Sequence, residues 1–359
     1  MAKLGDIATI QSGGTPARSI AEYWEDGTIP WVKISDIKSK HLNQTEEMIT
    51  EAGLENSSAK IFPKGTILYT IFATLGETSI LDINAATNQA IAGISITDSR
   101  VLPDYLYYYL LSQKIHVQKI GRGVAQNNIN MKLLRDFDVP LPSKEAQLNI
   151  IEQLNRVTEL LFLRKQQLTK LDELIKARFV EMFGDPYTNS KDYPLKKGES
   201  FFKLSNGKAV PESKRLNGGI PAYGGNGISW YTDESLFDAD TIVVGRVGFQ
   251  SGNVHLVKGP LWVTDNAMYM SSCDFSQYNL TFLIELMAHV DFTKFQDAGD
   301  LKKITQKPFM QFEYLCPPLS LQNQFSAFVA EVDKSKVEVQ KALDQTQLLF
   351  DSLMQQYFG

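Results

Sequence analysis

Apolar residues recur every seven positions in two long stretches of the chain. The first series is Leu154, Leu161, Leu168, Ile175 and Met182, and the second is Phe325, Val332, Val339 and Leu353. Arg164 and Arg178 interrupt the companion positions of the first series, and Lys336 those of the second. Heptad spacing of this length is typical of a coiled-coil seam rather than of a broad core face. The pattern therefore predicts two long helices, over residues 144–184 and 320–359.

Each long helix follows a segment with a different pattern. Short apolar runs such as Thr66–Phe72 and Thr241–Gly245 are separated by Gly, Asn and Asp turn signals, which is typical of short strands. An apolar helical stretch then precedes each long helix, at Tyr105–Leu111 and Leu280–Leu286. We therefore expect one mixed α/β domain over residues 1–143 and another over residues 185–319.

The two halves also resemble each other in sequence. Pro140–Gln147 resembles Pro317–Gln324, with an offset of 324 − 147 = 177, and Ala86–Ala90 resembles Val263–Ala267, with the same offset of 267 − 90 = 177. Phe183–Gly184 matches Phe358–Gly359 at an offset of 175. Internal similarity at a nearly constant offset indicates a tandem duplication. We expect an α+β fold in which two similar domains form a pseudo-twofold repeat and the long helices form an antiparallel coiled coil. The alternative is two independent amphipathic helices, each covering its own domain.

Composition restricts the class of protein. A chain of 359 residues is long enough for two sizeable cores, and 43% hydrophobic with 21% charged residues is ordinary for a globular protein. We find no signal-peptide pattern and no apolar run of membrane-spanning length. Cys273 and Cys316 are too few for a disulfide framework or a four-thiolate zinc site, so we expect a cytoplasmic protein.

The charge pattern bears on DNA binding. The formal net charge of −5 argues against tight DNA binding by the chain alone, but not against a DNA reader whose partners supply most phosphate contacts. Basic residues gather locally in two groups. For each group, the alternatives are a solvated face and a set of phosphate contacts. One group is Lys33, Lys38, Lys40 and His41, and the other is Lys196, Lys197, Lys203, Lys208, Lys214 and Arg215.

Motifs for catalysis are missing from the sequence. There is no Asn/Asp-Pro-Pro-Tyr/Phe segment of an adenine methyltransferase, and Asn206-Gly-Lys208 is followed by Ala209 rather than by a phosphate-loop hydroxyl residue. The four histidines are scattered without metal-ligand spacing. Nuclease sites usually have a Glu-x-Lys segment soon after their first aspartate. No such segment follows Asp238 in the group Asp238, Asp240 and Asp265. We expect a non-catalytic chain without a metal or cofactor of its own.

The order of these elements resembles the specificity subunit of Type I restriction–modification systems, over essentially the whole chain. In this family, two variable target-recognition domains are each followed by a long helix that opens on a Pro-Pro-Leu/Ile-x-x-Gln signature. In the second copy the two prolines, Pro317 and Pro318, are adjacent. In the first copy Leu141 separates Pro140 from Pro142. The matching segments are Ser12–Pro16, Ile29–Val32, Val139–Gln147, Gly224–Ile228 and Cys316–Gln324.

The resemblance implies a function. Residues 1–143 and 185–319 would be the target-recognition domains, and the helices would be the spacer between them. The chain would read double-stranded DNA with a bipartite target and direct N6-adenine methylation by two modification subunits, which bind S-adenosylmethionine. Restriction subunits, which use ATP and Mg²⁺, would join in some systems.

Candidate DNA contacts are polar residues on loops between the expected strands. Arg and Lys bind guanine edges, Asn and Gln bind adenine edges, and Lys, Arg and hydroxyl groups hold phosphates. Asn88–Gln89 and Asp265–Asn266 occupy similar places in the repeat, which favours a scaffold role for them. The candidates in the first domain are Lys33, Ser35, Lys38, Thr74, Asn88, Gln89, Arg122 and Asn127, and those in the second are Lys208, Lys214, Arg215, Tyr223, Asn226, Arg246, Gln250, Asn253 and Asn266.

Two other classes of protein remain open from the sequence. One is a coiled-coil adaptor that binds only proteins, which the negative net charge favours. The other is a divergent restriction endonuclease with its own cleavage site, for which the aspartates above are the only support.

Overall fold

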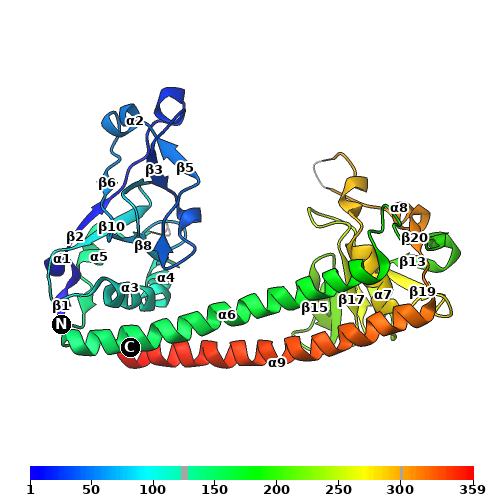
Figure 1. Cartoon of the computed structure of the whole chain (residues 1–359). Coiled ribbons are helices and arrows are strands. Elements are labelled where there is room, and N and C mark those ends of the chain that lie inside the picture. Colours follow the sequence, from blue (N-terminus) through cyan, green and yellow to red (C-terminus); the bar gives the residue numbers. More distant parts are fainter. Residues whose placement is uncertain (123–127, 300–301) are drawn as a thin grey trace. The chain divides into compact units, whose positions relative to one another are not determined.

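The computed structural model describes residues 1–122, 128–299 and 302–359 and shows a mixed α/β chain (Figure 1). The chain divides into two compact units. Unit 1 comprises residues 1–163 and 343–359, and unit 2 comprises residues 164–342. Each unit therefore contains one sheet-rich part and one half of each long helix. The assignment of residues 1–143 and 185–319 as separate recognition domains stays a prediction.

The sheet-rich part of unit 1 contains short strands and short helices. Its elements are β1 (Ala2–Lys3), α1 (Leu4–Ile7), β2 (Ala8–Ser12), η1 (Ala21–Tyr23), β3 (Ile29–Val32), η2 (Ile34–Asp36), β4 (His41–Leu42), β5 (Glu47–Ile49), α2 (Glu51–Glu55), β6 (Ile61–Phe62), β7 (Ile67–Thr70), β8 (Thr78–Leu81), β9 (Ala85–Thr87), β10 (Ile91–Ile96), α3 (Pro103–Ser112), α4 (Lys114–Arg122), α5 (Met131–Arg135) and β11 (Asp138–Val139).

Unit 2 has a shorter series of elements of the same kinds. They are β12 (Leu195–Lys197), η3 (Gly198–Ser200), β13 (Phe202–Asn206), η4 (Glu212–Lys214), β14 (Ile220–Gly224), β15 (Gly227–Thr232), β16 (Thr241–Gly245), β17 (Val254–Val257), β18 (Trp262–Val263), β19 (Ala267–Cys273), α7 (Leu280–Ala288), η5 (Phe292–Phe295), α8 (Lys307–Gln311) and β20 (Glu313–Leu315).

The two units share most of their sheet topology, although β4 and β6 of unit 1 have no counterpart strand in unit 2. The main sheet of unit 1 has the order β2-β10-β7-β8-β4, and that of unit 2 has the order β13-β19-β16-β17. In the second sheets, β3 pairs in parallel with β9, and β14 pairs in parallel with β18. Each unit also has a two-stranded antiparallel ribbon, β1–β11 or β12–β20. The expected tandem repeat is confirmed.

The structural offset of the repeat differs from the offset found by sequence matching. The Ile71 N–H donates to the Ala90 carbonyl, and the Arg246 N–H donates to the Asn266 carbonyl, both at 2.9 Å. Ala90 is therefore equivalent to Asn266, at 266 − 90 = 176, and not to Ala267. The sequence match aligned two alanines, but Ala90 lies in a turn whereas Ala267 begins β19. The expected equivalence of Asn88–Gln89 with Asp265–Asn266 is wrong by one residue for the same reason.

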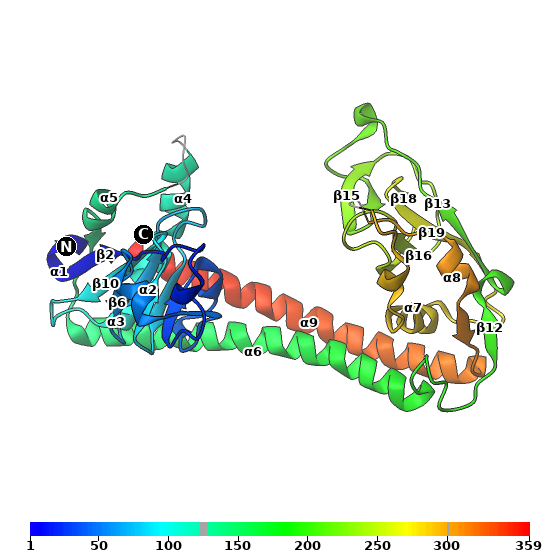
Figure 2. The ribbon, with the colours of Figure 1, turned by 90° about the horizontal axis from the view of Figure 1, so that it is seen from above.

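The long helices are α6 (Lys144–Phe183) and α9 (Leu319–Phe358), each of 40 residues. In unit 1, the Tyr357 hydroxyl near the end of α9 donates to Gln153 near the start of α6, at 2.7 Å. In unit 2, the Phe325 ring near the start of α9 lies 5.5 Å from the Phe183 ring at the end of α6. Within each unit, the segments of the two helices therefore lie side by side and run antiparallel, as expected (Figures 1 and 2).

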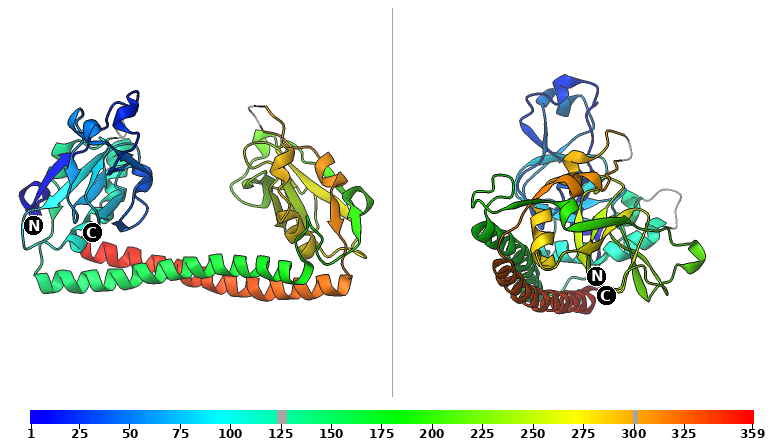
Figure 3. Two further views of the ribbon diagram at one scale, coloured as in Figure 1. Left: turned by 45° about the horizontal axis from the view of Figure 1, so that its top comes forward. Right: turned by 90° about the vertical axis from the view of Figure 1, so that its right-hand side faces the viewer.

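Each unit attaches its sheet to the helix pair through one short helix (Figure 3). In unit 1 this is α3, whose Tyr108 hydroxyl donates to Asn155 of α6 at 2.7 Å. In unit 2 it is α7, where the Phe282 ring lies 4.6 Å from that of Phe183. These contacts belong to the hydrophobic cores of the two units, so the helices form part of each core rather than a separate layer.

Burial along the helices follows the expected seam in part. Leu154, Leu161 and Ile175 of the first series are buried, and so are Phe325 and Val332 of the second. The remaining seam positions are only half-buried, namely Leu168, Met182, Val339 and Leu353. Among the described residues, no helix combines the length and the apolar character that crossing a membrane requires.

Candidate nucleic-acid interface

Five segments of unit 2 meet where several of its strands end. We call them the loop face of unit 2, defined as residues 206–208, 224–227, 246–253, 264–266 and 302–305. The Lys208 N–H donates to the Val263 carbonyl (2.8 Å), the Arg246 N–H donates to Asn266, and the Gly248 N–H donates to the Lys302 carbonyl (2.8 Å). The Thr264 N–H also donates to the Tyr223 carbonyl (2.8 Å), next to the 224–227 turn. Backbone hydrogen bonds of these segments and of the adjacent Val263 and Tyr223 therefore hold the loop face together.

Glycine allows two of these segments to touch. A Cβ atom on Gly225, in the turn between β14 and β15, would lie 3.2 Å from the Cα atom of Gly245 and 3.3 Å from the Asn266 carbonyl oxygen. That spacing is tighter than most side chains accept, so the turn comes this close only because Gly225 has no side chain. The exposed Asn226 next to it is therefore held beside Arg246 and Asn266.

Six of the nine candidates from the second half of the chain lie on the loop face. Asn226, Gln250, Asn253 and Asn266 are exposed, as is Lys208, whereas Arg246 is half-buried. The Arg246 and Lys208 cations form no ion pair with another described residue. An uncommitted guanidinium among exposed amides is the side-chain set that hydrogen-bonds to base edges in the major groove.

The other three candidates of unit 2 have partners within the unit. The Lys214 ammonium lies 2.6 Å from the Glu234 carboxylate, and this hydrogen bond raises the pKa of Lys214. The Arg215 guanidinium lies 4.1 Å above the Trp230 ring. Tyr223, in β14, packs against the core cluster beneath β16. These residues are less available to a ligand than the six on the loop face.

The candidates in unit 1 fall into two groups. Thr74 lies in the turn between β7 and β8, which corresponds to the Arg246–Asn253 loop. The Asn88 side-chain oxygen accepts from the Ala90 N–H of its own turn (3.1 Å), and the Gln89 side chain accepts from the Thr15 hydroxyl. These bonds are compatible with a scaffold role for Asn88 and Gln89, which stays a prediction.

Lys33, Ser35 and Lys38 form the second group, on the segment between β3 and β4. The Lys33 ammonium donates to Glu46 (2.8 Å) and to Glu47 (3.0 Å), which raises the pKa of Lys33. Its hydrogen bond lowers the pKa of Glu46 in turn. Lys38 lies 3.7 Å from Glu46, and Ser35 is exposed in η2. The carboxylates neutralise this basic group, so it offers little net charge to a phosphate.

The last two candidates of unit 1 are Arg122 and Asn127. The Arg122 side chain and Asn127 lie outside the described residues. In unit 2, Lys303 bridges Val247 as Asn128 bridges Phe72 in unit 1, at an offset of 303 − 128 = 175. Lys302 and Lys303 therefore join the loop face. The signal that could have found them was the repeat itself, because Asn127 was a candidate.

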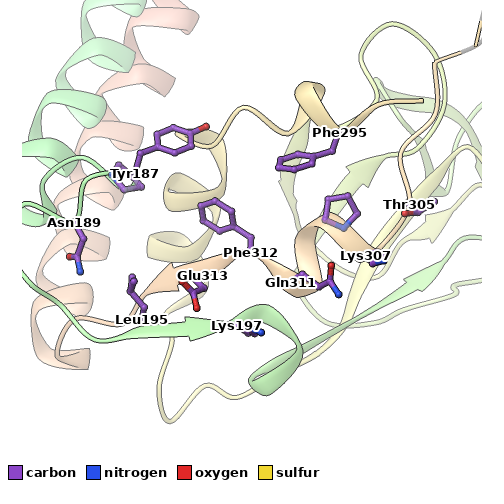
Figure 4. A pocket seen from close by; sticks show the side chains of 12 residues that line it. Tyr187, Asn189, Leu195, Lys197, Phe295, Thr305, Lys307, Gln311, Phe312 and Glu313 are labelled. Carbon is purple, nitrogen blue, oxygen red and sulfur yellow. The ribbon is translucent and has the colours of Figure 1, made fainter. Parts of the chain in front are cut away.

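A hollow on unit 2 touches the loop face only at Thr305. A cavity of about 660 Å³ opens beside β12, β20 and α8, with the Tyr187, Phe295 and Phe312 side chains around it (Figure 4). None of the seventeen candidates lines it. Across the described residues, no group of three or more His, Cys, Asp or Glu side chains is placed to hold a metal ion.

The chain is similar to known proteins. Residues 1–173 match the family described as Type I restriction modification DNA specificity domain. The specificity subunit of the Type I restriction enzyme MjaIX from Methanocaldococcus jannaschii is 29% identical over 265 residues, 72% of this chain and 58% of that protein. The specificity subunit of EcoprrI from Escherichia coli is 24% identical over 292 residues, 75% of this chain and 71% of that protein.

A solved structure shows the same fold. It is the S subunit of a Type I restriction-modification system from M. genitalium, with a TM-score of 0.59 and 17% identity, and the match covers 99% of this chain and 95% of that one. Both relatives are named as specificity subunits of Type I restriction enzymes. From these matches, residues 1–173 carry a Type I restriction modification DNA specificity domain, and the chain as a whole shares the fold of that S subunit.

Proposed function

We propose that this chain recognises a bipartite DNA target and directs N6-adenine methylation by partner modification subunits. The observation that carries the proposal is the repeat, because two units of related topology would provide two readers in a single chain. The loop face of unit 2 supports it further, with four cations that make no ion pair with another described residue. These are Lys208, Arg246, Lys302 and Lys303.

In this proposal the chemistry belongs to the partners. The modification subunits would bind S-adenosylmethionine, and any restriction subunits would use ATP and Mg²⁺. The chain itself would position bases and phosphates. Its net charge of −5 fits a reader that depends on partners for much of its phosphate binding.

Mapping methylated adenines across the genome, with and without this chain, tests the proposal. We expect a two-part motif with one methylated adenine in each half, and the loss of that methylation when the chain is deleted. An unchanged pattern would contradict the proposal. A complex with partners that retains no duplex DNA in a gel shift would favour the adaptor, and Mg²⁺-dependent cleavage by the isolated chain would favour the endonuclease.

Arg246→Ala tests reading by unit 2. Removing a bidentate contact to guanine is expected to weaken binding by about 1–3 kcal/mol and to relax one position of one half-site. Methylome sequencing of a strain carrying the variant reads this directly. Lys214→Ala is the matched control, because the Lys214 ammonium already forms an ion pair with Glu234. Equal relaxation of both half-sites by Arg246→Ala would rule out independent readers.

Exposed apolar residues on the helices offer two equivalent docking faces for the partners. Phe162 of α6 and Val337 of α9 are both exposed and are related by 337 − 162 = 175. Leu174 and Leu349 are also exposed and are related by 349 − 174 = 175. Repetition of an exposed apolar pair at the offset of the repeat supports two copies of one partner.

We therefore expect one chain to bind two modification subunits. Light scattering of the complex at saturating partner should give the mass of a one-to-two assembly. A variant with Phe162→Glu and Leu349→Glu should lose one partner, since both changes fall in unit 1. Leu148→Glu serves as the control, because Leu148 is exposed on α6 but its counterpart, Asn323, is polar. A wild-type assembly that stops at one partner would contradict this stoichiometry.

A further inference from the structure

Phe249 is exposed to a degree that is unusual for an aromatic side chain. It lies in the loop between β16 and β17, on the loop face of unit 2, and its side chain is 91% exposed. Other exposed phenylalanines of unit 2 are partly covered, such as Phe275 at 59%. Among the described residues, no aromatic ring is paired with Phe249. The whole ring is therefore available to a ligand.

The loop that carries Phe249 is held firmly. Gly248 and Gly252 have φ angles of +95° and +101°, which glycine adopts readily. The Ser251 N–H donates to the Gly248 carbonyl (3.0 Å), and the Gly252 N–H donates to the Gly245 carbonyl (2.8 Å). The Gln296 amide donates to the Ser251 carbonyl (2.6 Å) from outside the loop. A ring on such a loop is pre-organised, so less conformational freedom is lost when it contacts a partner.

The neighbours of Phe249 indicate the kind of surface it would meet. Arg246, Gln250 and Asn253 belong to the same loop and carry the groups that hydrogen-bond to base edges. The major groove presents only one apolar group, the 5-methyl of thymine. The corresponding loop of unit 1 also exposes a phenylalanine, Phe72. An apolar side chain among polar base readers is thus found in both units.

We propose that Phe249 is a specificity-determining residue that recognises thymine by packing its ring against the 5-methyl group in the major groove. The inference rests on the proposed function, since it requires unit 2 to read DNA. Insertion of the ring between bases is the other geometry open to it. Insertion must unstack a base step, and that penalty is of the same size as the gain from burying the ring. Contact with a methyl group needs no such distortion.

The test uses the full chain in complex with its modification subunits and duplexes that contain the methylome-defined target. Each thymine is replaced in turn by deoxyuridine, which removes only the methyl group. At one thymine we expect the wild-type complex to lose about fourfold in affinity, the factor that burial of one methyl group contributes. The Phe249→Ala complex should bind the two duplexes equally, and Phe249→Leu should keep part of the difference.

The controls separate this inference from the proposed function. Phe275 follows the end of β19 that lies away from the loop face. Phe275→Ala therefore removes an exposed phenylalanine and should leave the thymine preference unchanged. A Phe249→Ala complex that still distinguishes thymine from deoxyuridine would overturn the inference, and so would a target without any sensitive thymine. The inference would also be wrong if Phe249→Ala weakened binding equally on all sequences and if 2-aminopurine, placed at the contacted base step, became fluorescent on binding of the wild-type complex. Those two results would indicate insertion of the ring between bases. Failure of the wild-type complex to bind the target would count against the proposed function itself.

Discussion

Replacing Phe179 by alanine is expected to destabilise unit 2 by about 3–5 kcal/mol, the usual effect of truncating a fully buried phenylalanine. The Phe179 side chain on α6 is fully buried, and its ring lies 5.7 Å from Phe282 of α7 and 5.6 Å from Phe325 of α9. Three helices therefore meet at this ring. Its removal leaves a cavity that rigid helices cannot close, so α7 should detach from the helix pair.

Hydrogen exchange followed by mass spectrometry measures this effect in each unit separately. We expect faster exchange in peptides of α7 and β19, and unchanged exchange in peptides of α3 and β10. Phe162→Ala is the matched control, because Phe162 lies on the same helix but is 58% exposed. It should change stability by no more than about 0.5 kcal/mol. Equal exchange in both variants would show that Phe179 does not join the unit to the helices.

The sequence could predict the pair of long helices, but not which residues attach the sheet-rich part of each unit to them. Heptad spacing identified Leu154, Leu161 and Ile175, which are buried. It missed Phe179, because Phe179 follows Arg178, where the heptad series breaks. The series breaks there because the end of α6 packs against α7 as well as α9, so its apolar face turns toward the sheet-rich part. In contrast, Leu168 of the predicted seam is only half-buried.

The loop face shows a similar limit. Gly, Asn and Arg in the loops indicated the right segments, because such residues gather where strands turn. Which cations remain unpaired depends on contacts across the fold. Lys33 meets Glu46 and Glu47 only because β5 pairs with β3. Lys303 joins Arg246 through a bridge between Val247 and a segment more than fifty residues later. No local pattern in the sequence encodes either contact.

The proline–glutamine signature that opens each long helix has a physical explanation in the structure. Gln147 is fully buried, accepts from the Leu102 N–H (3.0 Å), and donates to the carbonyls of Arg100 (2.9 Å) and Pro142 (3.0 Å). Gln322 is also fully buried. It accepts from the Asn279 N–H (2.8 Å) and donates to the carbonyls of Gln277 and Pro317, both at 2.9 Å.

The two glutamines thus make the same three bonds in the two units. Leu102 and Asn279 are the residues that precede α3 and α7. Each glutamine therefore ties the first turn of a long helix to the start of the short helix that lies under the sheet. Their separation is 322 − 147 = 175, whereas sequence matching aligned Gln147 with the exposed Gln324. The wrong glutamine was matched because the sequence comparison paired Pro140 with Pro317, whereas the glutamine bonds show that Pro142 is the equivalent of Pro317.

The variant Gln322→Met tests whether Gln147 is equivalent to Gln322 or to Gln324. Methionine fills a similar volume but makes no strong hydrogen bond, so it leaves one buried N–H and two buried carbonyls without their partner. Each unsatisfied buried group is unfavourable by about 1–3 kcal/mol, and we expect unit 2 to lose about 3 kcal/mol or more in stability. Gln147→Met should have an effect of the same size in unit 1. Urea titration, with hydrogen exchange to assign the loss to a unit, measures both.

Gln324→Met provides the control within the same turn of α9. Gln324 is exposed, so its replacement should change stability by no more than about 0.5 kcal/mol. If Gln324→Met destabilised unit 2 while Gln322→Met did not, the 177-residue alignment would be right. The structural equivalence of Gln147 and Gln322 would then have to be abandoned. The expected opposite result would mean that the signature acts as a clamp, because its glutamine joins the backbone at Gln277 and Asn279 to the backbone at Pro317, which follows Gln277 by 317 − 277 = 40 residues.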